Sequence, residues 1–213
     1  MRLYLSSFRL GNHPDRLVAL ARGHMRAAVI LNACDWMPPD DREVRVAQEI
    51  AALEGLGFAA SELDLRRYAG AQAELAAALT GVGLLWVRGG NPFILRRTMI
   101  ESGADDVIRA LLACDALVYG GFSAGPVVLG PSLRGVELVD DPRLGGVESE
   151  DDEAWECLGV LPYAIAPHYR SDHPESAAVE ELVGYYIDHK IPFRALRDGE
   201  VIVVDGVTEE VLR

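Results

Sequence analysis

The sequence predicts an α/β protein, a three-layer sandwich in which a mostly parallel central sheet lies between helices. Short apolar runs alternate with longer segments of helical period, which is typical of parallel strands joined by crossover helices. The composition, 50% hydrophobic and 25% charged residues, is that of an ordinary globular protein. Because a domain usually takes roughly 100–200 residues, we expect residues 1–213 to form a single domain.

The expected strands are short apolar runs bounded by polar residues or glycine. They are Leu3–Leu5, Ala27–Asn32, Ala59–Leu65, Gly83–Val87, Ala116–Tyr119 and Tyr163–Ala166. Nearer the C-terminus, Phe193–Leu196 and Val201–Val204 flank the turn dipeptide Asp198-Gly199, which predicts a terminal β-hairpin.

The expected helices are longer segments whose apolar residues recur every three or four positions. In Asp41–Leu56, for example, Val46, Ile50 and Leu53 follow this spacing. The others are Ala71–Leu79, Pro92–Leu112 with a break at Ser102-Gly103, and Pro174–His189.

The charge balance excludes several classes of partner. With 33 acidic and 20 basic residues the net charge is −13, so we expect no nucleic-acid partner. The acidic run at 148–153 is interpreted as a solvated surface loop. The longest uncharged run, 116–133, contains glycines and prolines that would break a membrane helix, so no membrane partner is expected.

The N-terminus and the cysteines favour a cytoplasmic protein. The charged Arg9 ends the N-terminal segment before it reaches the length of the apolar stretch of a signal peptide. Cys34, Cys114 and Cys157 are odd in number and widely spaced, which argues against a disulfide framework and against a zinc site.

The most informative motif is Gly121-Phe122-Ser123-Ala124-Gly125, a Gly-x-Ser-x-Gly sequence that follows the apolar run 116–119. A buried strand that turns sharply into a helix is the setting of a nucleophile elbow. Ser123 is therefore the candidate nucleophile, at the carboxyl end of the sheet where α/β sites lie.

A serine hydroxyl needs a base, usually histidine. Of the five histidines, His168 ends the apolar run 163–167, so a strand could deliver it to the same edge of the sheet as Ser123. His173 precedes Pro174 and resembles a helix cap. A metal site made of His168, Asp172 and His173 is not expected, because the spacing does not place them on one helical face.

The base needs an orienting acid, and two carboxylates compete for the role. Asp140 is the first choice because it ends an apolar stretch, and Glu137 is the alternative. For the oxyanion, the amide of Ala124 supplies one donor, and Gly89-Gly90-Asn91, after the strand at 83–87, suits the second.

These residues resemble the peptidase E and cyanophycinase family of serine peptidases, which has a class I glutamine amidotransferase-like (flavodoxin-like) fold. The resemblance rests on Val87–Phe93, on Gly121–Gly125, and on Leu161-Pro162 followed by Pro167-His168-Tyr169. It implies that Ser123 is the nucleophile and His168 the base, with the glycine pair and Ala124 around the oxyanion. In the family's aspartyl dipeptidases an arginine after the histidine receives the aspartate carboxylate. Here 171–176 contains none, and Arg170 is the nearest substitute.

The expected function is that of a serine-type exopeptidase acting on short peptides through an acyl-enzyme, with no cofactor and no metal. The expected partner is then a small peptide substrate, and the sequence leaves open whether the chain forms a homodimer. Two alternatives remain: a catalytically silent binding member of the same fold, and an esterase with the same order of serine, acid and histidine.

Overall fold

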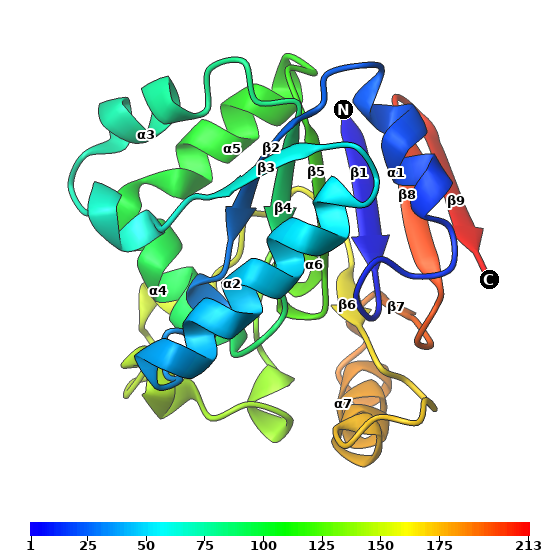
Figure 1. Ribbon diagram of the computed structural model, residues 1–213. Helices are drawn as coiled ribbons and strands as arrows, with labels where there is room; N and C mark the ends of the chain where they lie inside the picture. The colour runs from blue at the N-terminus through cyan, green and yellow to red at the C-terminus, as the bar shows by residue number, and fades with distance from the viewer.

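The computed structural model describes residues 1–213 and confirms the α/β class (Figure 1). A seven-stranded sheet runs through the molecule, and its first five strands are parallel to their neighbours. Across the sheet the strands are β3 (Ala59–Glu62), β2 (Arg26–Ile30), β4 (Leu84–Val87), β5 (Val118–Phe122), β1 (Arg2–Ser6), β8 (Val201–Asp205) and β9 (Thr208–Leu212).

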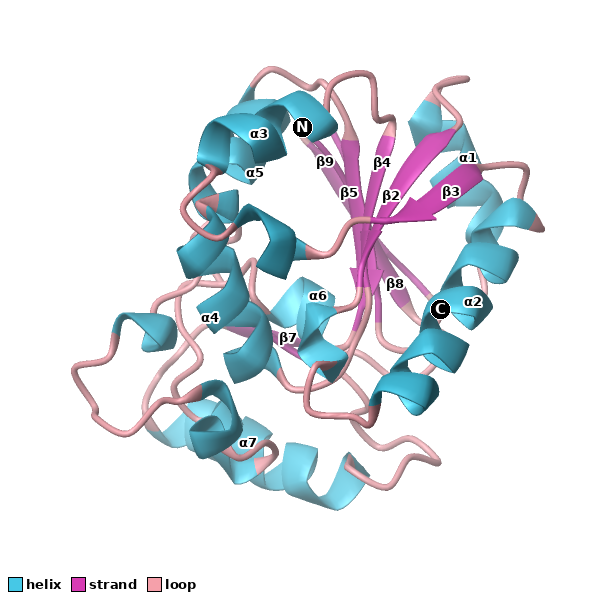
Figure 2. Ribbon diagram, turned by 60° about the vertical axis from the view of Figure 1, so that its left-hand side comes forward, coloured by secondary structure: helices cyan, strands magenta, loops and turns pink.

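Helices cover both faces of the sheet, which makes the three layers seen in Figure 2. One face carries α1 (Pro14–Ala21) and α2 (Pro39–Glu54). The other carries α3 (Gln72–Ala78), α4 (Pro92–Ser102) and α5 (Ala104–Ala113). The expected break between α4 and α5 lies at Gly103, whose φ of 68° ends the first helix. The sequence interpretation did not predict α1.

The core follows the alternation of side chains along each strand. Leu3 and Leu5 of β1 belong to a cluster of 30 buried residues on the α4 and α5 face, and Tyr4 between them belongs to a cluster of 15 on the α1 and α2 face. Trp86 of β4 likewise points away from Leu85 and Val87. The strands are thus apolar on both sides, as expected of a covered parallel sheet.

The strand register brings several loops to one edge of the sheet. Ser6 pairs with Phe122, and Val87 pairs with Gly121, so the loops that follow β1, β4 and β5 begin side by side. The antiparallel strand β8 starts with Val201 opposite Ser6, so the loop before β8 reaches the same place. We call this the carboxyl edge.

The strand pairing predicted for the terminal hairpin is wrong. Phe193–Leu196 does not pair with Val201–Val204. Instead β7 (Phe193–Ala195) pairs in parallel with β6 (Ala164–Ala166) in a small separate sheet, and α7 (Ser176–Asp188) connects them. Phe193 packs on Tyr186 of α7, with ring centroids 5.7 Å apart, so tertiary packing overrides the local turn signal. The hairpin that does form is β8 with β9.

The remaining chain between β5 and β6 is a long excursion of short helical turns, which includes α6 (Ala124–Val127) and the 3₁₀ turns η3 (Val136–Leu138), η4 (Pro142–Gly145) and η5 (Glu153–Trp155). The acidic run within it is largely exposed, as expected. None of the helices has the length and apolar character needed to cross a bilayer.

Candidate active site

Ser123 stands where β5 ends and α6 begins. Its φ of 52° and ψ of −115° are unusual for a residue with a side chain, and such backbone strain persists only where the surroundings enforce it. Its amide donates to the carbonyl of Ser6 at 3.3 Å, which fixes the turn against β1. Ser123 is half-buried, and its hydroxyl makes no hydrogen bond inside the protein.

The glycines around Ser123 allow the turn to press against β4. A Cβ atom at Gly121 would lie 2.2 Å from the carbonyl oxygen of Val87, and one at Gly125 would lie 2.3 Å from the same oxygen. Both are far below any contact that a real Cβ atom makes. The motif therefore needs glycine at these positions for a steric reason.

His168 lies two residues after β6, and its side chain is 2% exposed. It also has a positive φ, 60°. Its backbone amide donates to the hydroxyl of Ser7, which directly follows β1, at 2.8 Å. Because Ser123 is tied to Ser6 and His168 to Ser7, the structure brings both predicted residues to the end of the same strand.

The carboxylate that His168 contacts is Asp198. Its Oδ1 lies 2.7 Å from Nδ1 of the imidazole, so Nδ1 donates to it and Nε2 remains as the acceptor. The same Oδ1 accepts from the Ser7 hydroxyl at 2.8 Å, and the Asp198 amide donates to the hydroxyl of Ser171 at 2.8 Å. Asp198 is thus held in place from three directions.

The expected acids do not occupy this position. Glu137 is exposed in η3, and Asp140 lies in a separate pocket beside Ser123; neither makes a hydrogen bond to His168. The sequence did contain a signal for Asp198. It follows β7 by three residues, just as His168 follows β6 by two, and β6 and β7 are parallel neighbours. The sequence analysis missed this relation because it paired Phe193–Leu196 with Val201–Val204 instead.

The surroundings of His168 favour the neutral form of its imidazole. Burial lowers the pKa of His168 below its usual value, and the charge of Asp198 opposes that effect without cancelling it. The ring of His173 stacks on that of His168 with centroids 3.7 Å apart and also lowers its pKa. A neutral imidazole with a free Nε2 is the form that can accept a proton.

A small pocket opens next to Ser123 and Ala124. Its walls are mostly apolar, and two carboxyl groups, Asp140 and Glu175, complete it. Burial, followed by the nearby charge of Glu175, raises the pKa of Asp140 to about 7. The Asp140 carboxyl makes no hydrogen bond within the protein. No basic residue lines the pocket, so Asp140 has no cationic partner there.

Asp140→Asn should stabilise the protein at alkaline pH. The pKa of Asp140 is about 7 in the folded protein and has its usual value of 3.8 in the unfolded chain. Between pH 3.8 and pH 7 the folded protein therefore keeps a proton that the unfolded chain has released. Stability is therefore lost as pH rises through this window. We expect the variant to unfold about 5 °C above the wild type at pH 8 and at nearly the same temperature at pH 4, measured by thermal melts. A difference that does not depend on pH would contradict this.

The two expected oxyanion donors lie next to the elbow. A Cβ atom at Gly89 would stand 2.7 Å from Cβ of Ser123, which shows how closely this loop approaches the serine. The amide of Gly90 has no partner in the protein, and that of Ala124, first residue of α6, has none within its helix. Asn91 has another task, since its side chain caps α4 through the amides of Phe93 and Ile94.

Two further residue groups complete the description. Arg170 lies on the surface, with its guanidinium 3.5 Å from Glu180 of α7. Ligating atoms of His168, His173 and Glu175 lie within 4.8 Å of one another. The two imidazole planes are within 7° of parallel, so their ring nitrogens point side by side and do not converge on a shared ion.

The fold and the site thus define an α/β protein with a serine on a strand-to-helix elbow and a buried histidine paired with an aspartate. Residues 39–212 match the model of peptidase family S51, and the chain belongs to this family. It is a serine-type peptidase.

Relatives agree with this assignment, and a solved structure shares the fold. An uncharacterised peptidase of Listeria innocua, Lin0382, is 30% identical over 76% of this chain and 72% of its own. A Drosophila melanogaster protein named probable alpha-aspartyl dipeptidase is 31% identical over 61% of this chain, and the match spans 52% of the fly protein. A solved Listeria monocytogenes structure, assigned provisionally to peptidase E, superposes with a TM-score of 0.79 and 22% identity, covering 100% of this chain and 98% of its own.

Proposed function

We propose that the protein is a serine dipeptidase that hydrolyses short peptides through a covalent acyl-enzyme, with Ser123, His168 and Asp198 as its triad. The observation that carries the proposal is the pairing of Asp198 with Nδ1 of a buried His168, at the same strand end as an unpaired Ser123 hydroxyl. This is the arrangement of acid, base and nucleophile in serine hydrolases.

The chemistry then runs in two halves. Nε2 of His168 takes the proton of the Ser123 hydroxyl as the oxygen attacks the scissile carbonyl, and the amides of Gly90 and Ala124 bind the oxyanion. The imidazolium returns the proton to the leaving amine, and the acyl-serine forms. Water, deprotonated by the same imidazole, releases the acid product and restores Ser123.

The pocket beside Ser123 supports recognition of a cation. Asp140 and Glu175 would repel an aspartate side chain but would pair with the free amino group of a peptide. The fly relative is named an aspartyl dipeptidase, but 171–176 carries no arginine here, and Arg170 is engaged with Glu180. We therefore assign the pocket to the peptide's amino terminus and make no claim for aspartate.

A fluorophosphonate probe tests this function directly, because it modifies only an activated serine. We expect one label per chain, located on Ser123 by peptide mass spectrometry and absent from Ser123→Ala. Hydrolysis of an unblocked dipeptide panel should be lost in the same variant, and a panel of simple esters distinguishes an esterase. Folded protein that takes no label would instead support a catalytically silent member of the family.

A further inference from the structure

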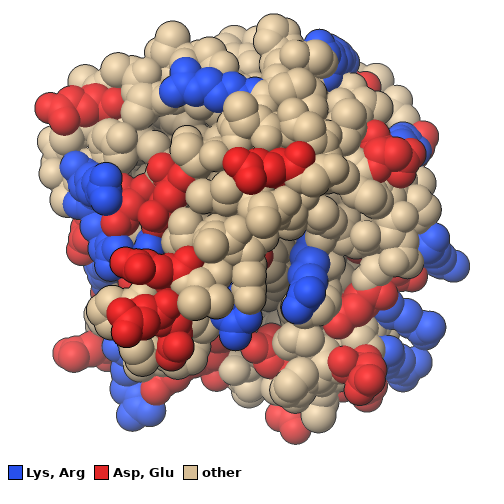
Figure 3. Space-filling model, viewed as in Figure 1, with Lys and Arg blue, Asp and Glu red and all other residues tan.

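A broad groove, separate from the pocket of Asp140, lies at the carboxyl edge. One wall is the loop after β1, from Phe8 to Asn12, and the other is the middle of α2, around Arg45 to Ala52. Phe122 and Arg88 also line it, and Asp198 borders it. Figure 3 shows a hollow in the middle of this face, with basic side chains beside it. We call it the arginine groove.

Three arginines line the groove, and two of them have no acidic partner. Arg88 is paired with Glu49, its Nε 3.1 Å from the carboxylate. Arg45 contacts only the amide oxygen of Gln48, at 3.2 Å, and the guanidinium of Arg9 lies 5.1 Å from the ring centre of Phe8. Of the 19 arginines of this chain, 13 lie within 4.0 Å of a carboxylate, and Arg9 and Arg45 are among the six that do not.

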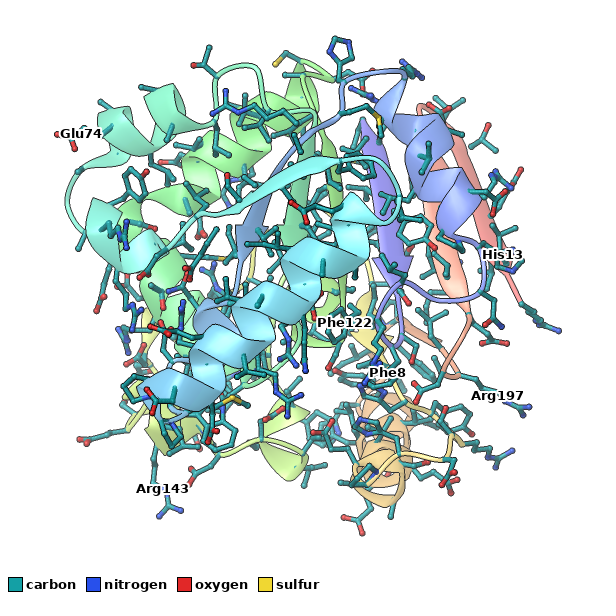
Figure 4. The ribbon with its side chains drawn as sticks, in the orientation of Figure 1. Phe8, His13, Glu74, Phe122, Arg143 and Arg197 are labelled. Atoms are coloured by element: carbon teal, nitrogen blue, oxygen red, sulfur yellow. The ribbon has the colours of Figure 1, made fainter.

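The groove reaches the reacting residues through two aromatic rings. Phe8 makes an edge contact with His168 at a centroid distance of 5.7 Å, and another with Phe122 at 6.0 Å. The guanidinium of Arg88 lies 5.6 Å from the ring centre of Phe122, the residue before Ser123. Figure 4 shows Phe8 and Phe122 close together where the groove opens.

The pocket beside Ser123 and the arginine groove therefore differ in the sign of their unpaired charges. The pocket beside Ala124 carries Asp140 and Glu175. The groove beyond Phe122 carries Arg9 and Arg45, and its two carboxylates already have partners, Glu49 in Arg88 and Asp198 in His168. A short unblocked peptide has the same polarity, a cation at one end and an anion at the other. In a dipeptide the carboxylate is one residue, roughly 3.5 Å of extended chain, beyond the scissile bond.

We infer that the arginine groove binds the free C-terminal carboxylate of a short peptide substrate, with Arg9 and Arg45 as its charged partners. The inference rests on the proposed function and names its substrate class: peptides short enough for both termini to be recognised at once. A guanidinium fork matches a carboxylate with two parallel hydrogen bonds, which a C-terminal amide cannot reproduce. Phe8 and Phe122 limit the access of water on one side of that contact.

The test compares a free dipeptide with its C-terminal amide. The probe is the dipeptide cleaved fastest in the panel, and its amide is the matched substrate. We expect kcat/KM to be at least about tenfold higher for the free acid, mainly through KM, since a hydrogen bond to a charged group contributes about 1.5–3 kcal/mol. Arg9→Gln and Arg45→Gln should each reduce this preference. The double variant should abolish it, because it lowers kcat/KM for the free dipeptide and leaves kcat/KM for the amide unchanged.

Arg67→Gln is the control, because it removes the same charge from an exposed arginine of the turn Leu65–Tyr68, remote from the groove. It should keep the wild-type preference. A merely structural role for Arg9 or Arg45 would slow both substrates equally and leave their ratio unchanged, and that result would overturn the inference.

Binding separates failure of this inference from failure of the proposed function. Calorimetry on Ser123→Ala, which cannot turn over substrate, should show tighter binding of the free dipeptide than of its amide, with the difference lost when Arg9 and Arg45 are both replaced. Equal affinity for the free dipeptide and its amide would refute carboxylate binding by the arginine groove and leave the proposed triad unaffected. Equal turnover of the two substrates by an enzyme that does take the fluorophosphonate would have the same meaning. A protein that takes no label refutes the triad, and the binding comparison still decides the groove.

Discussion

Asp198→Asn is expected to lower kcat by about three to four orders of magnitude while leaving the protein folded. The carboxylate holds Nδ1–H of His168 and so leaves Nε2 to accept the proton. An amide at this position can present its NH₂ group to the ring and stabilise the opposite tautomer, and it offers no charge to the imidazolium that forms. Steady-state kinetics with the best dipeptide would measure the loss, with circular dichroism to confirm the fold.

Asp140→Asn is the matched control for this experiment, because it makes the same change in an acid of the neighbouring pocket. If Asp140 holds the amino terminus, its replacement should act mainly on KM, and kcat should fall far less than in Asp198→Asn. The reverse order, with Asp140→Asn the slower enzyme at saturation, would return the orienting role to the acid that the sequence alone suggested.

Gly125→Ala is expected to have the largest effect on stability. The added methyl group would meet the carbonyl oxygen of Val87 at 2.3 Å, and a backbone atom in the middle of the sheet cannot give way as a side chain can. We expect the free energy of unfolding to fall by about 3 kcal/mol, and the melting temperature by about 8 °C. Thermal and urea unfolding would measure both.

Gly184→Ala provides the comparison, since a methyl group there, within α7, would have no neighbour within 4 Å. Alanine favours helix over glycine by up to about 1 kcal/mol, so this variant should be as stable as the wild type or more so. Equal melting temperatures for the two variants would mean that the close approach of the elbow to β4 is not required.

Much of the site could be predicted from the sequence because its signals are local. A buried strand leading into Gly-x-Ser-x-Gly places Ser123 by chain geometry alone, and the apolar run before His168 places the histidine at a strand end. The glycine pair after β4 is found in the same way. Each of these conclusions needs only a few neighbouring residues and the rule that the carboxyl ends of parallel strands share one edge.

The carboxylate that contacts His168 could not be found in this way, because the position of Asp198 depends on which strands pair. Asp198-Gly199 is also a good turn signal, and the local preference suggests that β7 and β8 form a hairpin. The competing solution, β7 beside β6 with α7 packed across them, depends on contacts between residues far apart in the chain. Asp140 was preferred because it follows an apolar stretch, but that stretch lines a pocket beside Ser123 and does not reach the imidazole.

The small sheet of β6 and β7 has a consequence for how the catalytic groups are aligned. His168 and Asp198 follow its two strands, while Ser123 follows β5 of the large sheet. The hydroxyl of Ser7 accepts a hydrogen bond from the amide of His168 and donates one to Asp198. The distance between the proposed nucleophile and the proposed base is therefore set where the two sheets meet. Any force that slides one sheet along the other would change the reactivity of Ser123 without disturbing the pair formed by His168 and Asp198.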